Sequence, residues 1–228
     1  TQKFIYMSSS SVYGNCHDKP ADENEPLETP HNEYDFSKRI IDEYVVNTNT
    51  QYYGLRLGTV NGWSPNMRNE LVINAMVKSA TSNNVVCVYN PSVYRAILSI
   101  TDLCRAIYTI IICNEDKRGI YNLSSFNNNV ENIGKEIANE MNVECKIFED
   151  ENFKTSYSFS MSSSNFETTF NFKFENTLSS IVKELRNDCK VTERIVCRVC
   201  DKPVYKLLDL GSQPLANDYH DNSTELDV

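Results

Sequence analysis

Residues 3–11 read Lys-Phe-Ile-Tyr-Met-Ser-Ser-Ser-Ser, an apolar run of strand length that passes into a polar tract. Such a run predicts a short buried strand whose carboxyl end opens on a ligand site. Strand-like and helix-like segments alternate from here onward, which favours an α/β fold with a largely parallel sheet. Further strands are predicted over residues 52–57, 85–89, 95–98, 121–123 and 145–148, and helices over residues 32–47, 71–80, 101–113, 130–141 and 177–185.

Three segments between these elements predict loops. The stretch over residues 18–30 is acidic and rich in proline, and residues 58–69 lead into the second helix. Residues 153–174 are rich in Ser, Thr, Phe and Asn and show the weakest periodicity, so we expect a long loop there.

Two further predictions concern the helices. In the helix over residues 101–113, Thr101 is the predicted N-cap, and the carboxylate of Asp102 is favourable at the positive end of the helix. The helix over residues 32–47 carries apolar residues at helical spacing, which predicts a core face made of Ile40, Ile41, Tyr44 and Val45.

Composition and charge narrow the class of protein. The 228 residues carry 22 Lys plus Arg against 31 Asp plus Glu, a net charge of -9 without a basic cluster, so we expect neither nucleic acid nor an anionic membrane as a partner. The longest apolar stretch, Ala106 to Cys113, is too short to span a bilayer, and a signal-peptide pattern is missing. Eight cysteines spread mostly through apolar segments predict buried, reduced thiols and a cytoplasmic protein.

Tyr34 and Lys38 lie four residues apart in a predicted helix, so they share one helix face. A neighbouring cation favours the phenolate form of a tyrosine, which a proton-shuttling phenol requires. Ser9 follows the first predicted strand, at the edge where open α/β sheets place their ligands, and its hydroxyl can bond the same substrate oxygen. The spacing alone fits an exposed surface pair as well as a catalytic pair.

Five segments occur in the order found in a known enzyme family: residues 4–14, 34–38, 55–62, 94–103 and 121–124. On these segments the chain resembles the extended short-chain dehydrogenase/reductases, the NAD-dependent epimerase/dehydratase family acting on nucleotide sugars. The resemblance implies a partial Rossmann-like parallel sheet with a small α/β substrate-binding region over residues 1–192. It also implies that the Gly-rich half of the family lies outside these residues, because no two of the seven glycines are separated by a single residue.

The resemblance implies a role for each matching residue. Tyr34 would be the acid/base and would lie beside the ribose of NAD or NADP. Lys38 would hold that ribose and activate Tyr34, and Ser9 would complete the catalytic set. Ser10 and Ser11 stand where sugar 4,6-dehydratases have an Asp-Glu pair. Without those carboxylates, water elimination lacks an acid and a base, so we expect an epimerase or a 4-ketoreductase rather than a dehydratase.

Four residues are candidates for substrate binding by the same resemblance. Arg95 stands where the family commonly has an arginine that pairs with the diphosphate of the sugar nucleotide, although a surface arginine on a strand edge is an equal alternative. Asn74 would face the nucleotide or be a satisfied helix-surface asparagine. Ser10 would line the site, and Thr59 replaces an asparagine of many members.

Cys197 and Cys200 form a Cys-x-x-Cys pair, which is half of a tetrahedral zinc site, a redox pair or a coincidence. With the Asp-Leu-Gly-Ser-Gln-Pro-Leu-Ala-Asn run over residues 209–217, the segment 193–228 resembles the start of the zinc-binding N-terminal domain of sugar C-methyltransferases. That resemblance implies an incomplete zinc-ribbon-like module, a second cysteine pair beyond Val228 and a further domain that binds S-adenosylmethionine. We therefore expect a chain cut at both ends.

Two hypotheses for function follow. The first is an NAD(P)-dependent nucleotide-sugar epimerase or 4-ketoreductase, fused to a sugar C-methyltransferase and inactive as this fragment alone. Its partners would be a dTDP-, UDP- or similar sugar and a second copy of the chain in a homodimer. The second is a non-catalytic module that binds a sugar nucleotide or a protein beside the methyltransferase. The Ser9, Tyr34 and Lys38 set favours the enzyme, and the missing Gly-rich half favours an inactive piece.

Overall fold

The computed structural model describes residues 3–148 and 157–188. The chain divides into two compact units, residues 1–190 and residues 191–228, of which the second lies outside the described residues. The predicted module over residues 193–228, with Cys197 and Cys200, therefore lies outside them too. In the part of the chain that the structure describes, no helix has the length and apolar character needed to cross a membrane.

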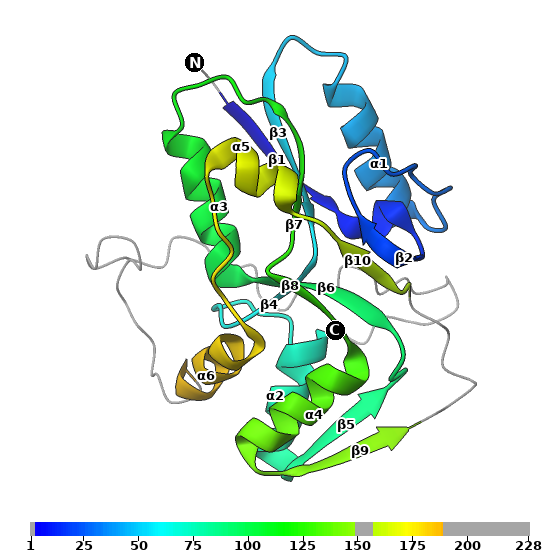
Figure 1. The fold of residues 1–228 in the computed structure, drawn as a ribbon, viewed down its shortest axis with the longest axis vertical. Coiled ribbons are helices and arrows are strands. Elements are labelled where there is room, and N and C mark those ends of the chain that lie inside the picture. The colour runs from blue at the N-terminus through cyan, green and yellow to red at the C-terminus, as the bar shows by residue number, and fades with distance from the viewer. Residues whose placement is uncertain (1–2, 149–156, 189–228) are drawn as a thin grey trace, which may run out of the picture. The chain divides into compact units, whose positions relative to one another are not determined.

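The central sheet holds three parallel strands in the order β1-β3-β7: β1 (Lys3–Ser9), β3 (Gln51–Leu57) and β7 (Gly119–Leu123). Side chains of a strand alternate between the two faces of a sheet, and both faces here are covered. Helix α1 (Glu33–Val45) lies on one side, and α3 (Ile100–Ile112) and α5 (Ser164–Phe170) lie on the other (Figure 1). This arrangement confirms the predicted parallel α/β sheet.

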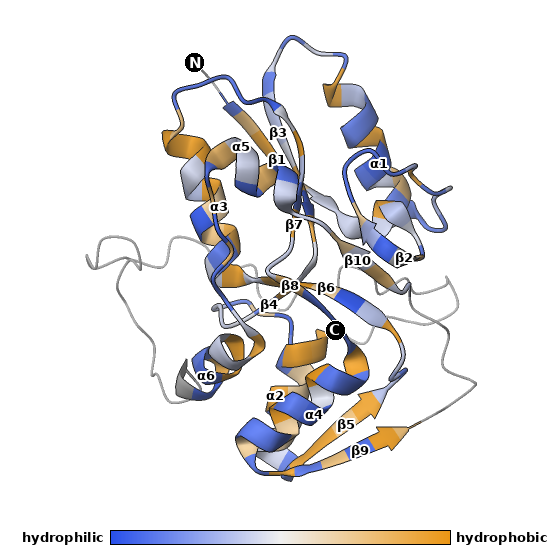
Figure 2. Cartoon of the chain, in the orientation of Figure 1, coloured by the Kyte–Doolittle hydropathy of each residue, from blue (hydrophilic) through white to orange (hydrophobic). Residues whose placement is uncertain are grey.

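A second core lies among α2 (Val72–Asn83), α4 (Val130–Met141), α6 (Leu178–Asp188) and the parallel pair β5 (Val85–Tyr89) and β9 (Glu144–Phe148). Figure 2 shows β5 and β9 as largely hydrophobic strands and the helices as banded. Fully buried aliphatic side chains fill this core, among them Ile73, Val86, Ile133 and Ile181. This part is the small α/β region that the sequence predicts.

Between the two cores, β4 (Thr59–Asn61) pairs in parallel with β6 (Tyr94–Ser99), and β6 pairs antiparallel with β8 (Phe126–Asn129). A short 3-10 helix, η1 (Ser10–Tyr13), follows β1. The remaining strands, β2 (Cys16–Ala21) and β10 (Phe159–Met161), pair with each other.

The three predicted loops are wrong in part. Strand β2 extends into the stretch over residues 18–30, and β4 lies within residues 58–69. Strand β10 and helix α5 lie within residues 153–174. Strands β2 and β10 are fixed by pairing Phe159 with Cys16, a contact between distant segments that local periodicity does not show. Helix α5 depends on Phe166 and Phe170, which pack against the core of the central sheet.

Three smaller predictions are wrong or only partly right. Ser99 rather than Thr101 caps α3, because the Ser99 side chain accepts a hydrogen bond from the Thr101 N–H at 3.1 Å. Of the core face predicted for α1, Val45 is buried and Ile41 half-buried, but Ile40 and Tyr44 are exposed. The face of α1 toward the sheet carries polar residues such as Asp42 instead. None of the five described cysteines is buried, and Cys104 is exposed on the outer face of α3.

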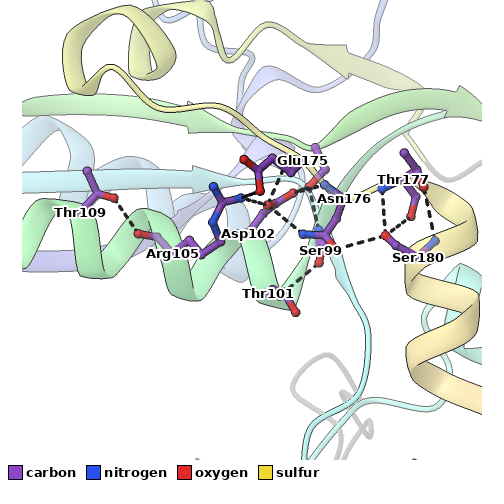
Figure 3. A network of polar contacts seen from close by, with 10 residues as sticks. Ser99, Thr101, Asp102, Arg105, Thr109, Glu175, Asn176, Thr177 and Ser180 are labelled. Atoms are coloured by element: carbon purple, nitrogen blue, oxygen red, sulfur yellow. Dashed lines mark hydrogen bonds and ion pairs between the residues drawn. The ribbon is translucent and has the colours of Figure 1, made fainter. Parts of the chain in front are cut away.

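A buried carboxylate fixes the segment that leads into α6. Asp102, with no exposed surface, accepts hydrogen bonds from Ser125 Oγ at 2.8 Å and from the backbone N–H and side chain of Asn176 at 3.1 and 2.9 Å. Arg105 donates to the same carboxylate at 2.9 Å (Figure 3). The start of α3 thus holds the residues before α6, which packs in the second core.

Candidate active site

Ser9 is the last residue of β1, where the strand passes into η1. Its side chain is nearly buried, accepts a hydrogen bond from the Ser11 N–H at 3.2 Å and lies 2.8 Å from Ser11 Oγ. The hydroxyl therefore caps η1 and is held in one place. Ser10 lies within η1 and is 3% exposed.

Tyr34 and Lys38 come from the first two turns of α1, which begins where the Asn32 side chain accepts a hydrogen bond from the Asp35 N–H at 2.8 Å. Lys38 Nζ lies 5.4 Å from the centroid of the Tyr34 ring and donates to the Met7 carbonyl oxygen at 2.9 Å. Met7 lies two residues before Ser9 on β1. The structure thus brings the phenol and the ammonium together and holds the ammonium at the carboxyl end of β1.

This arrangement has a defined chemical capacity. The phenol of Tyr34 is half-buried beside an ammonium, and a phenol in this position can exchange a proton with a hydroxyl or ketone that reaches it. The Ser9 hydroxyl supplies a hydrogen-bond donor and acceptor at the same end of the sheet.

Thr59 lies close to this end of the sheet along the chain. In the parallel register Ser9 is opposite Leu57, and Thr59 follows Leu57 by two residues at the start of β4. Its side chain is half-buried, and Thr59 pairs with Ile97 of β6.

Arg95 lies on β6, and its guanidinium donates to the Tyr157 carbonyl oxygen and packs 5.6 Å from the centroid of the Phe159 ring. Burial lowers the pKa of Arg95. The side chain therefore reaches across to β10 and the residues before it, rather than lying free on a strand edge.

Asn74 lies in α2 and is 2% exposed. Its amide oxygen accepts from the Gly62 N–H at 3.1 Å, and its amide nitrogen donates to the Arg68 carbonyl oxygen at 2.9 Å. Asn74 is thus buried and holds the loop over residues 62–68 through these two hydrogen bonds, and it is not an exposed helix residue.

The sequence did not indicate Tyr157, which links Asp35, beside Tyr34, to Arg95. Its hydroxyl donates to Asp35 Oδ2 at 3.0 Å, beside Tyr34, while its carbonyl oxygen accepts from Arg95. Burial and the contact with the Asp35 carboxylate raise the pKa of Tyr157 to about 12. Tyr157 lies in a segment without periodic pattern, so only the folded chain reveals the link.

In residues 3–148 and 157–188, no group of three or more His, Cys, Asp and Glu side chains is placed to hold a metal ion. The predicted zinc ligands Cys197 and Cys200 lie outside these ranges.

Comparison with solved structures supports the fold. The chain resembles dTDP-glucose 4,6-dehydratase from Bacillus anthracis in complex with NAD, with a TM-score of 0.69, 19% identity and coverage of 82% of this chain and 62% of that one. It also resembles UDP-glucuronic acid 4-epimerase from Bacillus cereus in complex with UDP-glucuronic acid and NAD, with a TM-score of 0.70, 18% identity and coverage of 81% and 60%.

Sequence comparison places the chain more closely. It is 31% identical to human dTDP-D-glucose 4,6-dehydratase over 141 residues, which are 60% of this chain but 39% of that enzyme, so the chain spans well under half of its relative. The profile of the NAD dependent epimerase/dehydratase family matches residues 1–124. Because this match covers more than half of the residues, the chain belongs to the NAD dependent epimerase/dehydratase family.

Proposed function

We propose that this chain is the catalytic part of an NAD(P)-dependent epimerase or 4-ketoreductase of nucleotide-diphosphate sugars, such as dTDP- or UDP-sugars. The observation that carries the proposal is the Lys38 ammonium packed on the Tyr34 ring and bonded to the Met7 carbonyl oxygen, two residues before Ser9 at the carboxyl end of β1. Family membership supports the same chemistry, because relatives named for sugar-nucleotide dehydration and epimerisation share the fold.

The donor set at this site fits the nicotinamide riboside end of NAD or NADP. Lys38 would hold the ribose hydroxyls beside Tyr34, and the cofactor, when bound, accepts a hydride from the sugar and returns it. Tyr34 Oη exchanges the matching proton with the sugar hydroxyl or ketone, and the Ser9 hydroxyl bonds the same oxygen. Lys38 would assist this exchange as the cation beside the Tyr34 ring.

The residues after Ser9 favour epimerisation or ketone reduction over dehydration. The human relative is a dehydratase, and water elimination needs an acid and a base next to the sugar. Here those two positions hold Ser10, which is buried, and Ser11, whose hydroxyl is engaged with Ser9. A serine hydroxyl is too weak an acid and too weak a base to fill either role at neutral pH.

The same proposal assigns the substrate contacts. Arg95 would pair with the diphosphate, for which a forked cation is suited. Ser10 and Thr59 would line the sugar side near Ser9. Asn74 would act through the loop over residues 62–68 that it fastens.

The test is turnover of dTDP- and UDP-sugars by the full-length protein with NAD or NADP. Tyr34→Phe and Lys38→Met should each lower kcat by about 100-fold or more, while calorimetry shows unchanged binding of the nucleotide sugar. Matched controls are Tyr44→Phe, an exposed tyrosine of the same helix, and Lys78→Met, an exposed lysine of α2, which should keep wild-type turnover. Full activity in Tyr34→Phe rejects the assigned chemistry. Nucleotide-sugar binding without turnover in the wild type favours the non-catalytic alternative.

For residues 193–228 we propose the start of a sugar C-methyltransferase zinc-binding domain, with S-adenosylmethionine bound in a further domain. The thiolates of Cys197 and Cys200 supply two of the four donors that a structural zinc site needs. Elemental analysis of the protein extended through a second cysteine pair should find zinc, and Cys197→Ser should lose it. Folded, metal-free protein rejects the zinc domain.

A further inference from the structure

A buried ion pair lies between α1 and the central sheet. Arg56 of β3 and Asp42 of α1 are 5% and 2% exposed, and Arg56 Nε donates to Asp42 Oδ2 at 2.8 Å. The hydroxyl of Tyr6, on β1, donates to the other carboxylate oxygen at 2.9 Å. Burial, followed by the charge of Asp42, raises the pKa of Tyr6, so this phenol stays a donor.

The same guanidinium reaches the turn that follows Ser9. Arg56 Nη1 donates to the Tyr13 hydroxyl at 2.7 Å, and the guanidinium carbon lies 5.1 Å from the centroid of the Tyr13 ring. Tyr13 in turn donates to the side chain of Asn122 on β7 at 2.8 Å. Burial alone would lower the pKa of Arg56, but Tyr13 and Asp42 hold it above its usual value.

These contacts join the two elements that carry the candidate catalytic residues. Tyr34, Lys38 and Asp42 are spaced four residues apart, so they follow one face of α1. Tyr13 is the last residue of η1, which Ser9 caps. One guanidinium therefore bonds both α1 and η1.

A buried ion pair is a poor device for stability, because taking two charges out of water costs about as much as their attraction returns. Its hydrogen bonds are directional, so it can fix one geometry where an apolar contact would allow several. We propose that Asp42 and Arg56 are positioning residues that lock α1 to η1 and so set the direction of Tyr34 relative to Ser9. This inference rests on the proposed function for its effect on turnover.

The first test is kinetic and uses the full-length protein. In the double variant Asp42→Val with Arg56→Met, the chain should stay folded, kcat should fall by about tenfold or more, and KM for the nucleotide sugar should stay within about twofold. The matched control is Asp102→Asn, which also removes a buried carboxylate that pairs with an arginine but lies in α3. If the double variant turns over as fast as this control, the pair does not position the site.

The second test needs no turnover. The Gly14 N–H donates to the Ser11 carbonyl oxygen at 3.0 Å, so its hydrogen exchange reports on η1. Asp42 lies on α1, so a change at this residue reaches Gly14 only through the contacts between α1 and η1. Asp42→Asn should speed hydrogen exchange at Gly14 by about tenfold, whereas Asp102→Asn should leave it unchanged. Unchanged exchange at Gly14 in Asp42→Asn overturns the proposal.

The two tests separate this inference from the proposed function. If Tyr34→Phe stays fully active, the proposed function fails, and Gly14 exchange still decides whether Asp42 and Arg56 couple α1 to η1. If Tyr34→Phe is inactive and the double variant is fully active, only the positioning role fails.

Discussion

Asp35 shows how one residue joins the candidate acid/base to the far part of the chain. Its carboxylate is 3% exposed and accepts hydrogen bonds from Asn32 Nδ2 at 2.8 Å and from the Tyr157 hydroxyl at 3.0 Å. Tyr157 lies 122 residues later, and its carbonyl oxygen holds Arg95. A single side chain therefore links the start of α1 to the candidate diphosphate ligand.

Tyr157→Phe tests this link. The change leaves a buried carboxylate short of one donor, so the free energy of unfolding should fall by about 1–3 kcal/mol, and nucleotide-sugar binding should weaken because the partner of Arg95 shifts. Urea unfolding and calorimetry measure the two effects. Tyr94→Phe, at a 44% exposed tyrosine one residue from Arg95, is the control and should change neither. Unaltered stability and binding in Tyr157→Phe would show that the Tyr157–Asp35 hydrogen bond neither stabilises the fold nor positions Arg95.

At the scale of the element, α1 has two faces with different tasks. Tyr34, Lys38 and Asp42 follow the inner face, while the opposite face exposes Phe36, Ile40 and Tyr44, which are 56%, 47% and 70% exposed. Exposed apolar residues at helical spacing are typical of a helix that packs against another surface. We therefore expect this face to be the contact of the homodimer that the family resemblance implies, in which the same patch of each copy would meet across a two-fold axis.

Ile40→Glu tests the dimer. The dimer of this variant would bury one unpaired carboxylate from each copy, and each burial costs free energy. Analytical ultracentrifugation should therefore show monomers where the wild type is dimeric. Thermal unfolding of the monomer should show that the fold is kept. Ile111→Glu, at a 58% exposed position on α3, is the matched control and should stay dimeric. A dimeric Ile40→Glu variant, or a monomeric wild type, would contradict an interface through α1.

At the scale of the whole molecule, several buried tyrosines make stability sensitive to alkali. Burial raises the pKa of Tyr121 to about 12 and raises that of Tyr13, while an unfolded tyrosine ionises near pH 10. The unfolded chain therefore loses these protons first, so the stability present below about pH 10 should be lost as pH rises toward 12.

Tyr121→Phe measures this effect for one residue. Urea unfolding at a series of pH values should show a shallower fall between about pH 10 and 12 in this variant than in the wild type. Tyr108→Phe, at an exposed position on α3, should leave the slope unchanged. An identical slope in Tyr121→Phe would mean that Tyr121 ionises alike in both states.

Local pattern predicted the elements whose reason for forming is local. The strand over residues 3–7 and the helix over residues 130–141 appear close to their predicted bounds, because apolar spacing and caps lie within the element. Tyr34 and Lys38 share one helix, so their spacing alone predicted that they meet.

Pattern failed where a distant segment decides. Strand β10 forms because β2 is its partner, and Phe166 and Phe170 of α5 pack on Tyr121 of β7. The same limit applies to the site, because the Asp42–Arg56 pair joins a helix to a strand that comes later in the chain. A charged residue in a strand pattern does not reveal its partner.

The most direct measurement follows the hydrogen that would move from the sugar to the cofactor. A nucleotide sugar deuterated at C4 is mixed with the full-length protein and its oxidised nicotinamide, and the nicotinamide is analysed by rapid quenching within the first turnover, before the hydride returns to the sugar. We expect deuterium to reach the nicotinamide in the wild type and in Tyr44→Phe, and the transfer to be slower by about 100-fold or more in Tyr34→Phe. Transfer at the wild-type rate in Tyr34→Phe, or no transfer in any of the three proteins, would contradict it.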